Sequence, residues 1–357
     1  MDNIAVVGAG NGGQLLAGHL ASKGHRINLF DIKKEIIDEI NQRGGIISFD
    51  GVIAGEGKVS CATTDLHSAM EGTEIIMIAT LTKDHIDVAK SLAPYLTEKH
   101  LVVLIPGGTF GALTFKAVLR KNGFQRLPVI AECQDLIYTC RSISPGISRA
   151  MGIKKDIPVA AIPASAGKQV AERLNGMLPY FKPMPNIIYT SLGNLAPVAH
   201  PGPSVLNAAR IEAQKEPIPY LETITPSVAR LMEKIDEERR SIAAALGTEL
   251  ISQKQWMQDC YGIEGKDIYE CYRNAVVYSE LKAQTSLKAR YITEDIPCGL
   301  VPMIAVAKIA GVNVPAMEAL VTLCGIITEE DYEQTGRNID RLGLRNMNME
   351  EFLSSIQ

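Results

Sequence analysis

Among the residues that could do acid–base chemistry, one histidine stands apart. Five of the six histidines lie within the first hundred residues, and His200 is the exception. It precedes Pro201, which restrains the local backbone. Near neutral pH an imidazole is the side chain best suited to exchange a proton with a reacting carbonyl or imine. His200 is therefore a candidate catalytic residue, with a buried structural histidine as the alternative.

A carboxylate on the far ring nitrogen would fix the tautomer of such a histidine and stabilise its cation. Residues 290–302 offer candidates, since Arg290, Glu294 and Asp295 occur there among proline and glycine breaks. We expect this segment to be a structured loop that leads into a helix. The planar donor fork of Arg290 suits a carboxylate ligand. The alternative is an internal salt bridge between Arg290 and Asp295 that closes the loop.

A second candidate site lies at the start of the chain, where an apolar run leads into a Gly-x-Gly-x-x-Gly turn. Gly8 permits the tight turn, Gly10 lets backbone approach a phosphate, and Gly13 lets the following helix pack on the strand. The helix begins near Asn11, with Gly12 next, and presents free N–H groups to an anion. The pattern predicts that these five residues bind a dinucleotide, with a purely structural turn as the alternative.

The residue that would hold the ribose follows at the expected distance. Eighteen residues after Gly13, the strand predicted at 26–30 ends at Asp31. Its carboxylate is placed to accept the ribose hydroxyls and would repel a 2′-phosphate. Asp31 therefore predicts NAD as the cofactor. Lys33 and Lys34 leave NADP possible, although paired lysines at a helix start are more often a solvated face.

The elements that must position these residues alternate between strand and helix in the first half. Strands are expected at 74–79 and 101–105, with a helix at about 82–95 between them and further strands near 129–131 and 159–162. Residues 44–60 resemble a hairpin insertion. Because ligands bind at the carboxyl ends of parallel strands, Gly107 and Gly108 are expected to approach the nicotinamide or to form only a turn. Glu132, at a strand end, is expected either to recognise an amino group or to lie on a solvated edge.

Helical periodicity replaces the strand signals from about residue 190. Thr225 and Pro226 are an N-cap and a first-turn proline, and Gly247 is a stop signal. The apolar stripe of this helix is Val228, Leu231, Ile235, Ile242 and Leu246, with Glu237, Glu238, Arg239 and Arg240 mostly on its other faces. We expect an α/β doubly wound parallel sheet of the Rossmann type at 1–188, which binds the dinucleotide, and an all-α catalytic domain at 189–357. The active site is expected in the cleft between them.

Composition limits the possible functions. A net charge of −4 with no long basic run gives no reason to expect nucleic acid. No leader precedes the first strand, and the apolar runs are too short for a membrane span, so a cytoplasmic protein is expected. The seven cysteines form no C-x-x-C pair, and we expect reduced core thiols and no metal site.

The helical-half motifs carry a family resemblance. Three motifs accompany the glycine turn. They are His200-Pro201 continuing to Leu206-Asn207, the helix start at Thr225–Leu231, and Thr293-Glu294-Asp295-Ile296-Pro297 followed by Gly299-Leu300-Val301-Pro302. Together they resemble the opine dehydrogenases, which include the octopine and nopaline enzymes, over nearly the whole chain.

The resemblance implies NAD(P)H-dependent reductive condensation of an amino acid with an α-keto acid. It implies that His200 is the catalytic histidine, Asp295 its carboxylate partner, and Arg290 the keto-acid ligand. Asn194 and Asn207 flank the histidine and are candidate substrate contacts or local caps. A homodimer is expected by analogy. The alternatives are a hydroxy-acid or polyol-phosphate dehydrogenase of the same two-domain shape, which usually employs a lysine, and a non-catalytic dinucleotide sensor.

Overall fold

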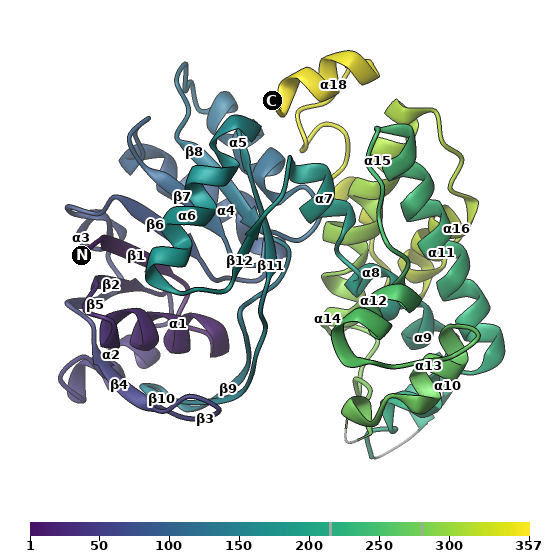
Figure 1. Cartoon of the computed structure of the whole chain (residues 1–357), viewed down its shortest axis with the longest axis horizontal. Coiled ribbons are helices and arrows are strands. Elements are labelled where there is room, and N and C mark those ends of the chain that lie inside the picture. Colours follow the sequence, from purple (N-terminus) through teal and green to yellow (C-terminus); the bar gives the residue numbers. More distant parts are fainter. Residues whose placement is uncertain (214–215, 280) are drawn as a thin grey trace. The chain divides into compact units, whose positions relative to one another are not determined.

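The structure is a computed structural model that describes residues 1–213, 216–279 and 281–357. Its internal contacts divide the chain into two compact units, residues 1–191 with 355–357 and residues 192–354. Figure 1 traces the chain through both units by colour. The last residues belong to the first unit, because the backbone N–H of Ala164 donates to the carbonyls of Ile356 and Gln357.

The first unit is built on an eight-stranded sheet in the order β12-β11-β8-β7-β6-β1-β2-β5. Neighbouring strands are parallel except β8 and β11, which are antiparallel. The predicted doubly wound sheet is therefore confirmed, with one reversed pair. Its strands are β1 (Asn3–Val7), β2 (Arg26–Phe30), β5 (Cys61–Thr63), β6 (Ile75–Ile78), β7 (Leu101–Leu104), β8 (Val129–Cys133), β11 (Ile157–Ile162) and β12 (Phe181–Pro183).

The central strands are buried because helices cover both faces of a parallel sheet. Every residue of β6 and β7 is buried, as their continuous apolar sequences predict. The helix expected at 82–95 is divided into η1 (Thr82–Asp84), α4 (His85–Leu92) and η2 (Ala93–Tyr95). The other helical segments of this unit are α1 (Asn11–Ser22), α2 (Lys34–Gln42), α3 (Leu66–Met70), α5 (Gly111–Lys121), η3 (Ala164–Ala166), α6 (Gly167–Met177) and α7 (Ile187–Leu192), whose last residue is counted in the second unit.

A second, four-stranded sheet packs against α1. The predicted hairpin is confirmed as β3 (Ile46–Gly51) and β4 (Gly55–Lys58), which pair antiparallel. It continues through β10 (Ile147–Ile153) to β9 (Tyr138–Ser144), in the order β4-β3-β10-β9. Helix α1 contacts strands of both sheets and so lies between them. Helix α1 is therefore packed on two sides.

The second unit is helical in its described residues, apart from one isolated β-bridge between Pro219 and Lys282. The predicted helix start at Thr225 is confirmed, because its hydroxyl accepts from the backbone N–H of Val228. The segments are α8 (Ala196–Ala199), α9 (Pro201–Leu206), α10 (Ala208–Ala213), η4 (Tyr220–Thr223), α11 (Pro226–Ala245), α12 (Gln253–Tyr261), α13 (Ile268–Asn274), η5 (Val276–Tyr278), α14 (Arg290–Thr293), the π-helical turn η6 (Ile296–Leu300), α15 (Val301–Ala310), α16 (Pro315–Thr328), α17 (Tyr332–Thr335) and α18 (Met349–Ser355), whose last residue is counted in the first unit.

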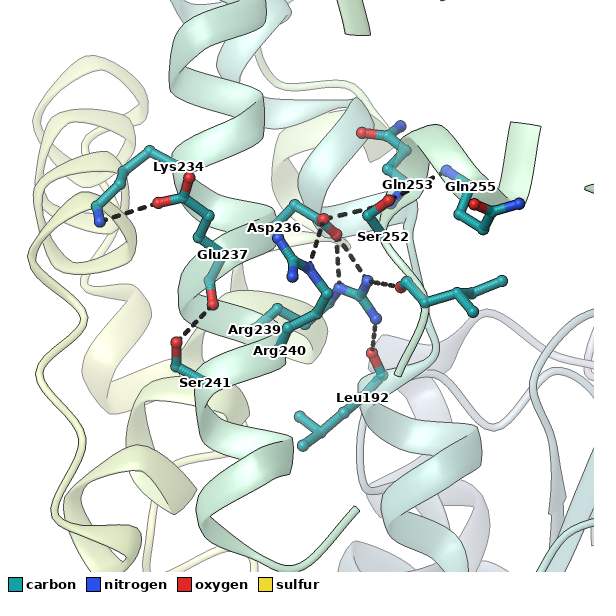
Figure 2. A network of polar contacts seen from close by, with 11 residues as sticks. Leu192, Lys234, Asp236, Glu237, Arg239, Arg240, Ser241, Ser252, Gln253 and Gln255 are labelled. Atoms are coloured by element: carbon teal, nitrogen blue, oxygen red, sulfur yellow. Dashed lines mark hydrogen bonds and ion pairs between the residues drawn. The ribbon is translucent and has the colours of Figure 1, made fainter. Parts of the chain in front are cut away.

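Helix α11 buries three charged residues, of which Glu238 and Arg239 were expected mostly on its other faces. Asp236, Glu238 and Arg239 are all less than 5% exposed. Arg239 donates to the Asp236 carboxylate and to the backbone carbonyls of Leu192 and Ile251, as Figure 2 shows. The Glu238 carboxylate accepts from the first N–H groups of α16. Each buried charge is thus compensated by polar backbone groups or by an opposite charge.

The cysteines are only partly core residues. All seven lie in the described part of the chain and are free thiols, but Cys260 is exposed and Cys61 and Cys140 are half-buried. Burial raises the pKa of these three thiols above the ordinary value, so they stay protonated near neutral pH. Residues 1–213, 216–279 and 281–357 contain no cluster of three or more possible metal ligands. Within the same ranges, no helix combines the length and apolar character needed to cross a bilayer.

Candidate functional site

The glycine turn follows β1 directly, and two of its glycines are required by close packing. Gly8 has φ +104°, a conformation that favours glycine. A Cβ on Gly13 would lie 1.8 Å from the carbonyl oxygen of Gly8. A Cβ on Gly12 would lie 2.6 Å from the side chain of Leu136. The first helical turn of α1 thus packs closely on the residue that follows β1 and on Leu136, which lies between β8 and β9.

Gly10 differs, because an added Cβ would meet no protein atom within 4 Å. It is the N-cap of α1 and no side chain caps the helix there. The space over the turn is thus open to a phosphate, which the N–H groups of the first helical turn would bind. Asn11 is exposed, and its side-chain oxygen accepts from the backbone N–H of Ser142 in β9. The geometry fits a dinucleotide pyrophosphate.

Asp31 lies at the carboxyl end of β2, beside the turn. Its Oδ2 accepts from the backbone N–H of Ala9 at 2.6 Å, and its Oδ1 accepts from that of Lys33 at 2.9 Å. The carboxylate therefore braces the glycine turn itself. Since each oxygen has a second lone pair, both can still accept from a ribose hydroxyl. Lys34 forms an ion pair with Asp38 at 2.6 Å on the solvated face of α2.

The loop after β7 is anchored from behind by Glu132. Gly107 and Gly108 are buried, and a Cβ on Gly107 would lie 2.5 Å from the Cβ of Glu132. Glu132 is 1% exposed, so the expectation of a solvated edge is wrong. Its carboxylate accepts from the backbone N–H of Ala112 and the hydroxyls of Thr190 and Ser191. Glu132 thus connects β8 to the first turn of α5 and to α7, and its buried carboxylate is hydrogen-bonded, as a buried charge requires.

In the second unit, His200 and Asp295 form a hydrogen-bonded pair. Nδ1 of His200 lies 2.7 Å from Oδ2 of Asp295, although the residues are 95 positions apart. Only 21% of the histidine side chain and 10% of the aspartate side chain are exposed. A proton on Nδ1 satisfies the carboxylate, which leaves Nε2 as the ring atom that can exchange a proton with a ligand.

Local breaks in the helices place the two residues. His200 joins α8 to α9, where Pro201 starts a new helix. Asp295 precedes η6, a π-helical turn that contains Pro297, and such turns are frequent at functional sites. The two segments pack closely, because a Cβ on Gly299 would lie 2.3 Å from the ring of Pro197. The expected loop is thus a short helix, α14, followed by this π turn.

Arg290 pairs with Glu294 rather than with Asp295. Its Nε lies 3.5 Å from Oε2 of Glu294, one helical turn along. Because 60% of the Arg290 side chain is exposed, its terminal nitrogens can reach a ligand, whereas only 9% of the Glu294 side chain is exposed. No sequence pattern favours Glu294 as the partner of Arg290, since the i,i+4 spacing matters only once this segment is known to be helical.

The two asparagines make local hydrogen bonds. Asn194 accepts from the backbone N–H of Ala196 at the start of α8. The side-chain amide of Asn207 is buried and donates to the carbonyls of Pro203 and Thr223, both at 2.9 Å. Asn207 thereby ties the end of α9 to η4. Substrate contact by either residue stays a prediction.

Comparison with known proteins identifies the class. A family model described as the α-helical domain of NAD/NADP octopine/nopaline dehydrogenase matches residues 183–328. A model described as the N-terminus of NAD-dependent glycerol-3-phosphate dehydrogenase matches residues 3–125. The similarity to the polyol-phosphate enzymes thus concerns the dinucleotide half, whereas the helical half matches the opine enzymes. With its Rossmann-type sheet and helical unit, the protein is an NAD(P)-dependent oxidoreductase.

Relatives that match along the whole chain narrow this class. The opine dehydrogenase of Arthrobacter sp. is 35% identical over 353 residues, which cover 99% of this chain and 98% of that protein. The vitopine synthase of Allorhizobium ampelinum is 27% identical and covers 98% and 97%. A structure of octopine dehydrogenase in complex with NADH and agmatine has the same fold, with a TM-score of 0.85, 19% identity and coverage of 100% and 99%.

The chain belongs to the opine dehydrogenase family. The reaction expected from its motifs is confirmed at this level: NAD(P)H-dependent reductive condensation of an amino acid with an α-keto acid.

Proposed function

We propose that His200 is the acid–base residue of this reductive condensation, with Asp295 as its partner. The 2.7 Å hydrogen bond between them is the observation that carries the proposal. Condensation of an amine with a keto carbonyl releases water and forms an imine, and a protonated imine accepts hydride readily. When bound, the nicotinamide cofactor supplies that hydride. His200 in its protonated form donates a proton through Nε2, and Asp295 holds the Nδ1 proton and balances the ring charge.

Arg290 binds the carboxylate of the keto acid in this proposal. A guanidinium holds a carboxylate by two parallel hydrogen bonds, and the exposed end of Arg290 provides them. The ion pair with Glu294 keeps the Nε side of the guanidinium in place. Asn194 and Asn207 are retained as candidate substrate contacts.

The dinucleotide binds the first domain through Gly8, Gly10, Asn11, Gly12 and Gly13, with Asp31 on the ribose and Gly107 and Gly108 near the nicotinamide. We propose residues 1–188 as this cofactor domain and 189–357 as the catalytic domain. The open space over Gly10 supports the first assignment and the dyad supports the second.

One assay tests the reaction. The purified protein is incubated with NADH or NADPH, a keto acid such as pyruvate, and a panel of amino acids. We expect cofactor oxidation only when both substrates are present. Oxidation with the keto acid alone would instead indicate a hydroxy-acid dehydrogenase, and none across a broad panel would favour a sensor.

A variant tests the role of the histidine. His200→Ala should lower kcat by about a hundredfold or more and leave NADH affinity nearly unchanged, because an acid–base group is lost while the cofactor site is intact. His67→Ala, at an exposed histidine, is the matched control. Turnover at the level of the unmodified enzyme in His200→Ala would sink the assignment.

We also propose a cytoplasmic homodimer. Helix α16 supports the dimer, because Leu323 and Ile326 are 40% and 71% exposed on it and would be covered in a symmetric pair. A sedimentation-equilibrium mass equal to one chain across the assay concentrations would refute the dimer.

A further inference from the structure

The imidazole of His200 is covered on one face by an aromatic ring that the sequence motifs did not single out. The ring of Tyr291 lies parallel to it, with centroids 3.9 Å apart and 9° between the planes. Tyr291 belongs to α14, four residues before Asp295. One short segment thus supplies both the group that binds Nδ1 and the group that stacks on the ring.

Tyr220 contacts both the segment that carries His200 and the ring of Tyr291. Its hydroxyl donates to the carbonyl of Ala199 at 2.8 Å, directly before His200. Its ring meets that of Tyr291 edge-on, with centroids 6.2 Å apart and 72° between the planes. Tyr220 is buried, and it connects the backbone before His200 to the ring of Tyr291. His200 is therefore positioned by a carboxylate, an aromatic face and a restrained backbone.

The stack affects the charged imidazole more than the neutral one. The face of an aromatic ring carries partial negative charge, which attracts a cation within about 6 Å of its centroid. Burial raises the pKa of Tyr291 above its ordinary value near 10, so the ring remains a neutral phenol through neutral pH. A neutral aromatic face therefore lies parallel to the imidazole of His200.

Other charges on the elements packed around His200 are already paired or exposed. Tyr291 and Asp295 face the ring directly, and Tyr220 is a neutral phenol. The ion pairs on the neighbouring elements are Arg290 with Glu294, Asp236 with Arg239 and Arg240, Lys234 with Glu237, and Arg210 with Glu222. Glu233 and Glu238 accept from backbone N–H groups, and Glu212, Arg230 and Glu318 are exposed.

We propose that Tyr291 is a positioning residue that acts through His200: its π face stabilises the imidazolium and so extends the acid-competent form to higher pH. This inference rests on the proposed role of His200. It assigns to Tyr291 no contact with substrate or cofactor.

The test varies the charge of the aromatic face at constant shape. Tyr291 is replaced by Phe and then by 4-fluoro-, 3,4,5-trifluoro- and pentafluorophenylalanine, and Tyr291→Leu removes the face altogether. Two readouts are measured: the alkaline limb of kcat/KM in the condensation direction, and the NMR titration of the His200 ring in the free protein. The NMR signal is assigned by its loss in His200→Asn. Tyr220→Phe, which loses the hydroxyl that bonds to Ala199 and Tyr272 but leaves the face of Tyr291 unchanged, is the matched control.

We expect Tyr291→Phe and Tyr220→Phe to keep the unmodified protein's midpoint. Successive fluorination should move the midpoint stepwise to lower pH, and Tyr291→Leu should lower it by about half to one and a half pH units. An unchanged midpoint across the fluorinated series would overturn the proposal, even if kcat fell. That result differs from failure of the proposed function, in which His200→Asn would retain turnover whatever Tyr291 does. Phe and its fluorinated analogues at position 291 test the proposal even if Tyr291→Leu does not fold.

Discussion

At the scale of single residues, the carboxylate of Asp31 holds the glycine turn and, in the proposed cofactor site, also lies where NAD and NADP differ. Its two oxygens accept from the N–H groups of Ala9 and Lys33, so the carboxylate is held in one orientation beside the glycine turn. A fixed negative charge at the ribose site disfavours a 2′-phosphate more strongly than a mobile one, because it cannot turn away. In the proposed cofactor site, the brace of the turn and the preference for NAD would therefore depend on the same carboxylate.

We expect the enzyme to prefer NADH over NADPH, and Asp31→Ser to reduce that preference by about tenfold or more as the charge repulsion is lost. The ratio of kcat/KM values for the two cofactors measures it. Asp31→Ser should also raise KM for both, since the turn loses its brace. If Lys33 contributes to NADPH binding in Asp31→Ser, the double variant Asp31→Ser/Lys33→Ala should have a lower kcat/KM with NADPH than Asp31→Ser alone. Comparable turnover of the unmodified enzyme with NADPH at equal concentration would contradict the NAD assignment.

At the scale of elements, the site in the second unit depends on how the π turn η6 packs on α8. Pro297 cannot donate a backbone hydrogen bond, and the turn around it is wider than an α-helix. Asp295 enters the turn at the point where it faces His200. Gly299 lies against Pro197, which leaves no room for even one extra carbon between the segments. The 2.7 Å distance between His200 and Asp295 thus depends on the contact of Pro197 with Gly299, which lies four residues after Asp295.

Gly299→Ala tests this dependence. The added Cβ would lie 2.3 Å from Cγ of Pro197, and a proline ring cannot rotate aside, so α8 and η6 must move apart. We expect kcat to fall about tenfold or more and the free energy of unfolding to fall by about 1–3 kcal/mol. Gly176→Ala is the control, since a Cβ on that helical glycine of α6 meets no atom within 4 Å. Full activity in Gly299→Ala would show that the dyad tolerates movement of the turn.

At the scale of the whole molecule, local signals were readable from the sequence and long-range pairings were not. The turn from Gly8 to Gly13 and the strand ending at Asp31 are specified within about thirty residues, and both are found as expected. The residue types of 290–302 indicate the segment that carries the partner of His200, but only the family resemblance selects Asp295, because no local pattern links residues 95 positions apart. The pairing of β3 with β10 is equally remote and left no signal beyond the hairpin.

Buried charges were missed for a related reason. Glu238, Arg239 and Glu132 belong to residue types that are almost never fully buried unless paired, so sequence patterns assign them to solvent. Apart from Asp236, which pairs with Arg239 within α11, their partners are backbone groups and side chains of other segments, which become neighbours only in the folded chain. The predicted architecture was therefore right, while the polar contacts that hold the site together had to be observed.

The stability of the first unit should depend on pH through His19. This histidine of α1 is 5% exposed, its Nδ1 lies 2.8 Å from the hydroxyl of Tyr138, and its pKa is lowered to about 4 by burial and then by Lys23. The unfolded chain, with an ordinary value near 6.5, binds the proton more readily. The contribution of His19 to the free energy of unfolding is therefore fully present above about pH 6.5. It is lost as the pH falls towards 4, and the total loss is roughly 3 kcal/mol.

His19→Asn isolates this effect, because asparagine keeps an acceptor for the tyrosine hydroxyl but does not titrate. The variant should be less stable at pH 7.5, and the difference from the unmodified protein should shrink steadily between pH 6.5 and 4.5. Hydrogen exchange of the α1 amides follows the first unit, while fluorescence of Trp256, the only tryptophan, follows the second unit as an internal control. Parallel pH profiles of α1 protection in the two proteins would show that the buried imidazole is not the titrating group, and the acid sensitivity of the unit would then have to come from its carboxylates.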